Sequence, residues 1–192
     1  MLYIIRHGQT DLNKARVLQG RSDAPLNEDG IRQAQEAREL FLKKGISFDR
    51  IYSSPLIRAV ATAGIIEPNL TPVTDDRLLE MDYGPYEGMD LRNPAPEVMT
   101  FFSDFVNQPA PEGMEPLSEV VARLGNFLEE IKEEIQHKNV LTATHAIAMK
   151  GALEYLTPES QGSYWSKHIR NCAVYQAEVR EDGSWSVPVE VK

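Results

Sequence analysis

Short apolar runs alternate with stretches of helical periodicity along most of this chain. The runs are four or five residues long, which is too short for a helix and typical of buried strands. They predict strands over 2–5, 50–53, 71–75 and 140–143. Between these runs, apolar side chains recur three and four residues apart, as on the buried face of a helix. This spacing predicts helices over 28–44, 56–66, 118–135 and 147–156.

Residues 81–117 interrupt the alternation, because they are rich in proline and glycine and hold only one short apolar stretch. Near the end of the chain, residues 172–179 and 184–189 alternate between apolar and polar like a terminal hairpin. The order of elements predicts an α/β fold, a three-layer sandwich with a mostly parallel central sheet and helices on both faces. We expect a single domain over 1–192, with 81–117 as a lid-like insertion.

Composition and charge narrow the possible partners. The chain has 192 residues with 20 basic and 29 acidic side chains, a formal net charge of −9. Nucleic acids and anionic membranes favour a basic protein, so we expect neither as a partner. No run approaches the roughly 18 apolar residues of a membrane span, and no signal-peptide pattern precedes Arg6. Cys172 is the single cysteine, which excludes an intramolecular disulfide. These features predict a cytoplasmic protein.

Polar side chains follow the predicted strands at the points where the strands end. Arg6 and His7 follow the first strand, and Arg58 lies one turn into the helix after the second. Glu80 lies beyond the third strand, and His145 follows the fourth directly. The carboxyl ends of parallel strands meet at one edge of a sheet, where ligands bind. We therefore expect these five residues to converge there.

Together, these five side chains suit phosphoryl transfer. Arginine presents a planar fork of donors to phosphate oxygens and stays charged. One histidine can attack phosphorus as a nucleophile, and a carboxylic acid can give a proton to the leaving alkoxide. A second imidazole can stabilise charge on the equatorial oxygens. No His, Cys, Asp and Glu cluster has metal-site spacing, so we expect no metal and no cofactor.

The remaining histidines and the cysteine do not share this placement. His137 ends a charged helix, where an imidazole stabilises the last carbonyl groups. His168 is interpreted either as an ordinary loop residue or as part of a pocket rim. Cys172 lies within the predicted hairpin strand, and we expect it in the core.

A series of short motifs spans nearly the whole chain. They are Arg6-His7-Gly8-Gln9-Thr10 with Asn13, Gln19-Gly20, Asp23-Ala24-Pro25-Leu26, Gly30 with Gln33-Ala34, Ser53-Ser54-Pro55-Leu56 with Arg58-Ala59 and Thr62-Ala63, Glu80 with Tyr83-Gly84 and Glu87-Gly88, Thr144-His145, and Asn171-Cys172-Ala173. In kind and in order, this series resembles the histidine phosphatase superfamily, the phosphoglycerate-mutase-like group, branch 1.

The resemblance implies a role for each of the five converging residues. It implies that His7 becomes a phosphohistidine and that Arg6, Arg58 and His145 hold the phosphoryl group. It also implies that Glu80 donates a proton and then acts as base for the attacking water. These roles agree with those assigned above from residue chemistry and position.

Further matches and two departures concern the walls of the pocket. Three residues match positions that line the family's pocket: Asn13, Gln19 and Gly20. The family commonly has glycine after the second histidine, where this chain has Ala146, and we expect the Ala146 backbone N–H to keep its phosphate contact. Many members carry arginine where this chain has Val17. Whether the neighbouring Arg16 covers that role is open.

Phosphatases and mutases share these motifs, so the segment after Glu80 must separate them. The family's mutases carry a longer insertion with paired arginines and a lysine, whereas here 81–118 holds one basic residue, Arg92. An acidic, apolar segment neutralises a bisphosphate poorly. This favours a metal-independent phosphomonoesterase that hydrolyses a small phosphorylated metabolite through a phosphohistidine intermediate. The aromatic residues of the segment either pack its helix or line the pocket for an apolar or nucleoside-like substrate.

Three other functions are weighed against this one. The chain could be a cofactor-dependent phosphoglycerate mutase or a protein phosphohistidine phosphatase. It could also be a non-catalytic phospho-ligand binding module, although a binder needs neither nucleophile nor acid. The expected partner is a small-molecule phosphomonoester, and a homo-oligomer is left open.

Overall fold

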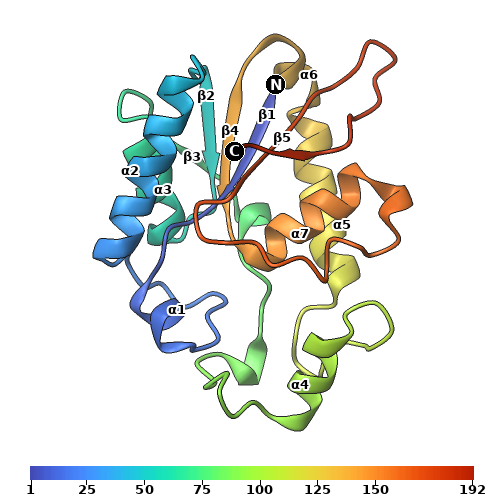
Figure 1. Ribbon diagram of the computed structural model, residues 1–192. Helices are drawn as coiled ribbons and strands as arrows, with labels where there is room; N and C mark the ends of the chain where they lie inside the picture. Colours follow the sequence, from blue (N-terminus) through green and yellow to red (C-terminus); the bar gives the residue numbers. More distant parts are fainter.

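A six-stranded sheet runs through the computed structural model, which describes residues 1–192. Its strand order is β3-β2-β4-β1-β5-β6 (Figure 1). The strands are β1 (Leu2–Arg6), β2 (Arg50–Ser53), β3 (Val73–Thr74), β4 (Val140–Thr144), β5 (Val174–Ala177) and β6 (Val189–Glu190). The first four are mutually parallel, while β5 is antiparallel to β1 and β6 to β5. The mostly parallel sheet expected from the sequence is confirmed.

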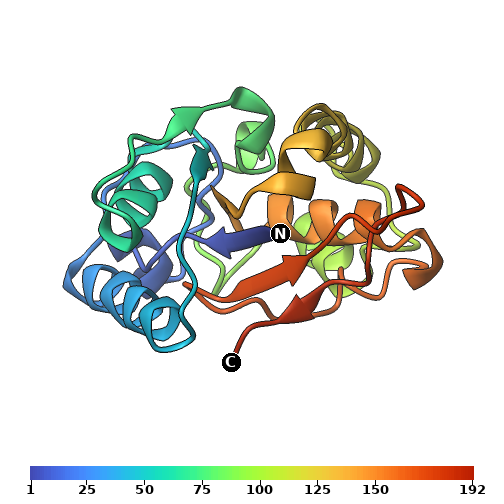
Figure 2. The same cartoon turned by 90° about the horizontal axis from the view of Figure 1, so that it is seen from above.

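Helices cover both faces of this sheet. They are α1 (Asp11–Ala15), α2 (Glu28–Lys43), α3 (Ile57–Ile66), α4 (Pro96–Ser103), α5 (Leu117–Glu130), α6 (Lys132–His137) and α7 (Ala146–Leu156). Figures 1 and 2 show α2 and α3 on one side of the strands and α5 and α7 on the other. The predicted three-layer α/β sandwich is therefore also confirmed.

The side chains of the central strands are divided between two hydrophobic clusters, one on each face of the sheet. Along β1, Leu2 and Ile4 belong to the cluster under α5 and α7, whereas Tyr3 and Ile5 belong to the cluster under α2 and α3. This alternation follows from the two-residue period of a strand. All residues of β4 are buried. Burial on both faces explains why the sequence shows continuous apolar runs at these two strands.

The observed elements depart from the predicted ones in three places. The stretch after β1 contains α1, which has no buried residue and begins at a capping box between Thr10 and Asn13. The single helix expected over 118–135 is divided at Ile131 into α5 and α6. In the terminal hairpin, β5 pairs with only two residues of β6, and the part nearer the turn is one bridge between Val179 and Trp185.

The prediction for Cys172 is wrong in one respect. The residue precedes β5 rather than lying in a strand, and its φ of 55° places it in the left-handed region. It is half-buried, and its backbone N–H donates to the carbonyl oxygen of Arg6 over 3.1 Å. Cys172 therefore lies in a turn before β5, and its hydrogen bond fixes this turn against the end of β1.

The segment 81–117 lies beyond the carboxyl ends of the strands, where Figure 1 draws it in green below the sheet. It is anchored rather than loose, because Met81, Val98 and Phe101 are buried in the cluster under α5 and α7. Its one α-helix is α4, as the sequence led us to expect. None of the helices combines the length and the apolar character needed to cross a membrane.

Candidate active site

The five residues selected from the sequence converge at the carboxyl edge of the sheet. Arg58 Nε lies 3.3 Å from His7 Nε2. The imidazole rings of His7 and His145 have centroids 5.1 Å apart. Glu80 accepts hydrogen bonds from the start of α7, directly after His145. Arg6 is adjacent to His7 in the chain, and the Glu80 carboxylate acts on the pKa of Arg6.

The His7 ring is fixed in one tautomer. Its Nδ1 lies 2.6 Å from the carbonyl oxygen of Gly8, which can only accept, so Nδ1 carries the proton. Burial, followed by the charges of Arg6 and Arg58, holds the pKa of His7 well below its usual value. The ring is therefore neutral near pH 7, and the unprotonated Nε2 faces Arg58. This is the form that a nitrogen nucleophile requires.

Arg58 is the largest fully buried side chain, and backbone carbonyl groups hold it in place. Its Nη1 donates to the oxygen of Ser22 over 2.7 Å, and its Nη2 donates to the oxygen of Gly20 over 2.6 Å. These two bonds leave Nε directed at His7. Burial lowers the pKa of Arg58, but an arginine remains charged.

Glu87 fixes the loop that holds Arg58. Its carboxylate accepts hydrogen bonds from the backbone N–H groups of Gly20, Arg21 and Ser22, and one of 2.6 Å from the Ser22 hydroxyl. A side chain at Gly20 would meet a Glu87 oxygen at 2.6 Å and the Met81 oxygen at 2.7 Å. The sequence motif included Glu87, but its residue type gave no sign of this contact with a backbone 67 positions away.

Glu80 is buried against the N-terminus of α7. Its Oε1 accepts from the N–H groups of Met81, Ile147 and Ala148 at 2.9–3.1 Å. Its Oε2 has one such contact, with Ile147 at 3.2 Å. The carboxylate is thus held at one oxygen, while the other is less engaged.

His145 is completely buried at the N-cap of α7. Its Nε2 lies 2.7 Å from the hydroxyl of Ser54, while its Nδ1 has no hydrogen-bond partner. Burial, with Arg58 as the next cause, holds the pKa of His145 well below its usual value. Ser54 was quoted in the sequence as part of a motif without a role, and its place after β2 is the only signal that could have suggested one.

The residues expected on the pocket wall also lie in this region. The Thr10 hydroxyl donates to Gln19 Oε1 over 2.7 Å, and the Asn13 amide donates to the same oxygen over 3.4 Å. Gln19 Nε2 is therefore oriented as a donor, and it is buried without a partner. Ala146 begins α7 and is not among the residues with positive φ, so this position does not require glycine.

Unpaired buried polar atoms are concentrated at this site. Five side-chain nitrogen or oxygen atoms are buried without a hydrogen bond, and three of them belong to predicted site residues: Arg6 Nε, Gln19 Nε2 and His145 Nδ1. A buried donor without a partner costs about 1–3 kcal/mol. All three are nitrogens that can donate, so the arrangement suits an anion.

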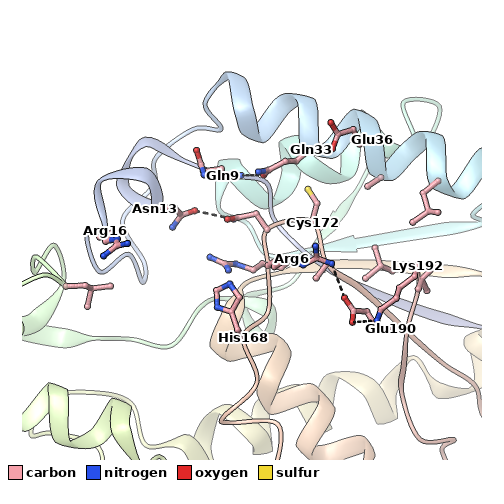
Figure 3. Close-up of a pocket in the computed structure, with 18 of the residues that line it drawn as sticks. Arg6, Gln9, Asn13, Arg16, Gln33, Glu36, His168, Cys172, Glu190 and Lys192 are labelled. Atoms are coloured by element: carbon pink, nitrogen blue, oxygen red, sulfur yellow. Dashed lines mark hydrogen bonds and ion pairs between the residues drawn. The ribbon is translucent and has the colours of Figure 1, made fainter.

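A cavity of about 980 Å³ opens beside Arg6 (Figure 3). Its lining includes Arg6 and Asn13 from the predicted site, together with Arg16, Val17 and His168. Figure 3 shows Asn13, Arg16 and His168 around one end, near Arg6. The pocket-rim interpretation of His168 thus agrees with the structure. Arg16 also faces this cavity, whereas His137 is exposed at the end of α6.

The far end of the cavity is of a different kind. It lies between α2 and the β5–β6 edge, and there Arg170 pairs with Glu190 over 3.5 Å. Burial raises the pKa of the adjacent Cys172 thiol to about 12, which leaves the thiol uncharged. No group of three or more His, Cys, Asp or Glu side chains in the structure could hold a metal ion.

The aromatic residues of 81–117 mainly contact one another. Phe101 and Phe105 meet edge to face with centroids 4.9 Å apart, and Phe105 lies 6.2 Å from Trp165. Tyr83 is buried, and burial raises the pKa of its phenol well above the usual value. The packing interpretation therefore describes Phe101 and Phe105 better than the pocket-wall interpretation does.

Comparison with known proteins matches this arrangement to one family. The sequence model of the histidine phosphatase superfamily (branch 1) matches residues 2–190. A Hydrogenobacter thermophilus protein named "Putative phosphoserine phosphatase 2" is 33% identical over 98% of this chain and 93% of its own length. A Yersinia pestis protein named "Probable phosphoglycerate mutase GpmB" is 33% identical over 94% of this chain and 85% of its own length.

Solved structures of other proteins are similar to this fold over nearly the whole chain. The mycobacterial glucosyl-3-phosphoglycerate phosphatase in complex with VO3 has a TM-score of 0.86 and 26% identity, covering 99% of this chain and 98% of the other. Phosphoserine phosphatase from Entamoeba histolytica, in complex with 3-phosphoglyceric acid, has a TM-score of 0.83 and 25% identity, covering 100% and 94%. Related structures thus bind small phosphorylated ligands.

Fold and relatives together define a class of α/β enzymes that act on phosphate esters. Within it, the chain belongs to the histidine phosphatase superfamily, branch 1, as its motifs indicated. The prediction of a phosphatase-type enzyme is confirmed at this level. Relatives named as mutases show that membership alone does not choose between hydrolysis and phosphoryl transfer to a second substrate.

Proposed function

We propose that this protein is a metal-independent phosphomonoesterase that hydrolyses a small phosphorylated metabolite through a phosphohistidine at His7. Residues 1–192 act as one catalytic domain, with 81–117 as the cover of its site. The observation that carries the proposal is the concentration of unpaired buried donors beside a neutral His7: Arg6 Nε, Gln19 Nε2 and His145 Nδ1. A phosphoryl group would supply the missing acceptors.

In the first step, His7 Nε2 attacks phosphorus and the bond from phosphorus to the leaving oxygen breaks. Arg58 Nε, 3.3 Å from His7 Nε2, is placed to bind an oxygen of the transferred group. Arg6 supplies a second positive charge, and charges fixed in advance are effective in a buried site. If the Ser54 hydroxyl donates to His145 Nε2, then Nδ1 carries the proton and donates to the phosphoryl group. Gln19 Nε2 and the Ala146 N–H are further donors to the phosphoryl group. Asn13 and Gly20 complete the wall of the substrate pocket.

Glu80 handles the proton in both steps. Its Oε2, the less engaged oxygen, gives a proton to the departing alkoxide. The resulting carboxylate then removes a proton from the water that attacks the phosphohistidine, so the second step returns Glu80 to its starting form. The three hydrogen bonds on Oε1 hold the carboxyl group in one orientation through both steps.

The surroundings favour hydrolysis over a mutase reaction. Arg92, the single basic residue of 81–118, is exposed and paired with Asp90 over 2.7 Å. Arg21 and Arg123, which approach the same segment, both pair with Glu115. These three arginines are therefore already paired with carboxylates and do not form the clamp that a bisphosphate requires.

The test is a phosphatase assay on a panel of phosphomonoesters, with and without EDTA. We expect turnover that EDTA does not affect, since no step uses a metal ion. Denaturation without acid should trap phosphate on His7, and the His7→Ala variant should lose both the label and the activity. A fully active His7→Ala protein would falsify the mechanism.

The rival reaction has its own readout. A coupled assay on 3-phosphoglycerate, with and without 2,3-bisphosphoglycerate, measures mutase activity directly. We expect no stimulation by the bisphosphate. Mutase turnover faster than hydrolysis would instead show that this chain transfers the phosphoryl group between substrates.

A further inference from the structure

Lys150 is a half-buried cation close to the proposed site, and the reaction above does not use it. It lies on α7, one helical turn after Ala146. Its Nζ donates to the carbonyl oxygen of Trp165 over 2.7 Å and lies 5.3 Å from the centre of the Phe105 ring. Phe105 belongs to the segment 81–117, which lies beyond the carboxyl ends of the strands (Figure 1). The ammonium therefore lies between α7 and that segment.

This ammonium has no acidic partner. None of the ion pairs in the protein includes Lys150. The Trp165 carbonyl is its one hydrogen-bond acceptor, so two of its three N–H groups are free.

The electrostatic environment links Lys150 to the site. Burial lowers the pKa of Lys150 to about 8; Glu80 raises that pKa and Arg6 lowers it, so both are within electrostatic reach. A partly desolvated ammonium beside another cation is stabilised when an anion binds next to it. The two free N–H groups, the contact with the segment 81–117 and this coupling together indicate an anion beside Lys150.

We propose that Lys150 determines specificity by binding one carboxylate on the leaving group of the substrate. The inference rests on the proposed function and narrows its substrate class to phosphate esters of hydroxy acids. A single ammonium with two free donors fits a monoanion, whereas a second phosphoryl group would need several cations. The paired cations around 81–117 do not supply these.

The test uses two substrates that differ only in the carboxylate, 3-phosphoglycerate and glycerol 3-phosphate. We expect the wild type to prefer the acid. The Lys150→Met variant, which keeps an apolar side chain of similar reach, should lower kcat/KM for 3-phosphoglycerate about 10- to 100-fold, mainly through KM, as expected for losing a hydrogen bond between charged groups. Its kcat/KM for glycerol 3-phosphate should change less than about threefold.

Two controls separate recognition from folding. Lys167 is exposed and lies 4.3 Å from the Tyr164 ring, so Lys167→Met removes a nearby lysine with a similar ring contact and should leave both substrates unchanged. An equal loss for both substrates in Lys150→Met would show that Lys150 only holds the Trp165 loop, and would overturn the inference. So would a wild type that does not distinguish acid from alcohol.

The failure of the proposed function would be recognised separately. Turnover of p-nitrophenyl phosphate, which has no carboxylate, reports the catalytic residues alone. If the wild type and Lys150→Met both hydrolyse it in a His7-dependent way while the acid is not preferred, only the inference fails. If the wild type does not hydrolyse it, the proposed function and the inference fall together.

Discussion

At the scale of single residues, hydrogen bonds to one polar atom of a side chain determine which other atom is available to a ligand. His7 Nδ1 is committed to the Gly8 carbonyl, and Glu80 Oε1 is committed to three backbone N–H groups. The other polar atom of each side chain has a single longer contact: His7 Nε2 with Arg58 Nε, and Glu80 Oε2 with the Ile147 N–H. In the proposed reaction, local hydrogen bonding would thus select the reactive atom in each case, without any need for an unusual residue type.

The Glu80→Gln variant tests the division of tasks within one side chain. The amide oxygen can keep the bonds to Met81, Ile147 and Ala148, but the group cannot carry a proton between steps. We expect a folded protein whose kcat is about 10²- to 10⁴-fold lower, the usual contribution of a positioned acid. The loss should be smaller with p-nitrophenyl phosphate, because its leaving group needs little protonation. An equal loss for alkyl and aryl esters would argue against Glu80 as the acid.

At the scale of elements, the loop 20–22 connects the segment 81–117 to the phosphate site. Glu87 holds the N–H side of this loop, and Arg58 binds its carbonyl side. The position of Arg58 therefore depends on a residue outside the five that converge at the site. Glu87 is in this sense a positioning residue.

A variant of Glu87 checks this dependence. Glu87→Gln places an NH2 group against the N–H donors of Gly20 and Ser22, which should displace the loop and lower kcat/KM about 10-fold or more, the scale of a lost charged hydrogen bond. Inorganic phosphate, which in the proposed reaction binds Arg58 but has no leaving group, should also bind more weakly. Glu97→Gln is the matched control, since Glu97 bonds only to the Tyr86 hydroxyl of the same segment. Unchanged phosphate binding in Glu87→Gln would contradict the positioning role.

Elements differ in how far the sequence could predict them. Strands β1 and β4 could be predicted from the sequence, because burial on both faces of the sheet makes them continuously apolar. The helix α1 buries no residue, so it has no hydrophobic period, and only its capping residues could have marked it. The predicted helix is divided at Ile131, where φ is −92° and ψ is 3°. Ile131 and Ile135 are nevertheless both buried, so the division leaves no trace in the pattern of apolar residues.

The candidate site shows the same limit. Arg6, His7 and His145 lie at strand ends or directly after them. Arg58 lies in the first turn of α3 and Glu80 in the loop after β3, so the order of elements brings the five residues to one edge of the sheet. The contacts of Ser54 with His145 and of Glu87 with the loop 20–22 join segments 91 and 67 positions apart. Such contacts, several of them to backbone atoms that are the same in every residue, have no counterpart in the sequence.

At the scale of the whole molecule, two buried neutral histidines tie stability to pH. The pKa values of His7 and His145 are lowered well below 6.5 in the folded protein. Below pH 6.5 the unfolded chain therefore binds protons that the folded protein does not bind. The free energy of unfolding therefore keeps its full value above pH 6.5. It falls as the pH decreases below 6.5, by up to about 1.4 kcal/mol per pH unit for each histidine.

Urea unfolding at pH 7.0, 6.0 and 5.5 measures this dependence. We expect the free energy of unfolding to decrease over this range. Replacing His145 by Gln should flatten the slope, whereas replacing the exposed His137 by Gln should leave it unchanged. An equal slope in the wild type and in His145→Gln would mean that His145 is charged in the folded state.

The bond between Glu87 and the loop 20–22 has a consequence for engineering and for divergence within the family. The segment 81–117 and the loop 20–22 cannot be exchanged independently between members, because each presents half of one contact. A chimera that imports a foreign cover to obtain a new specificity must import a matching partner for Gly20–Ser22 as well. Otherwise it would lose the carbonyl groups that hold the Arg58 guanidinium beside His7.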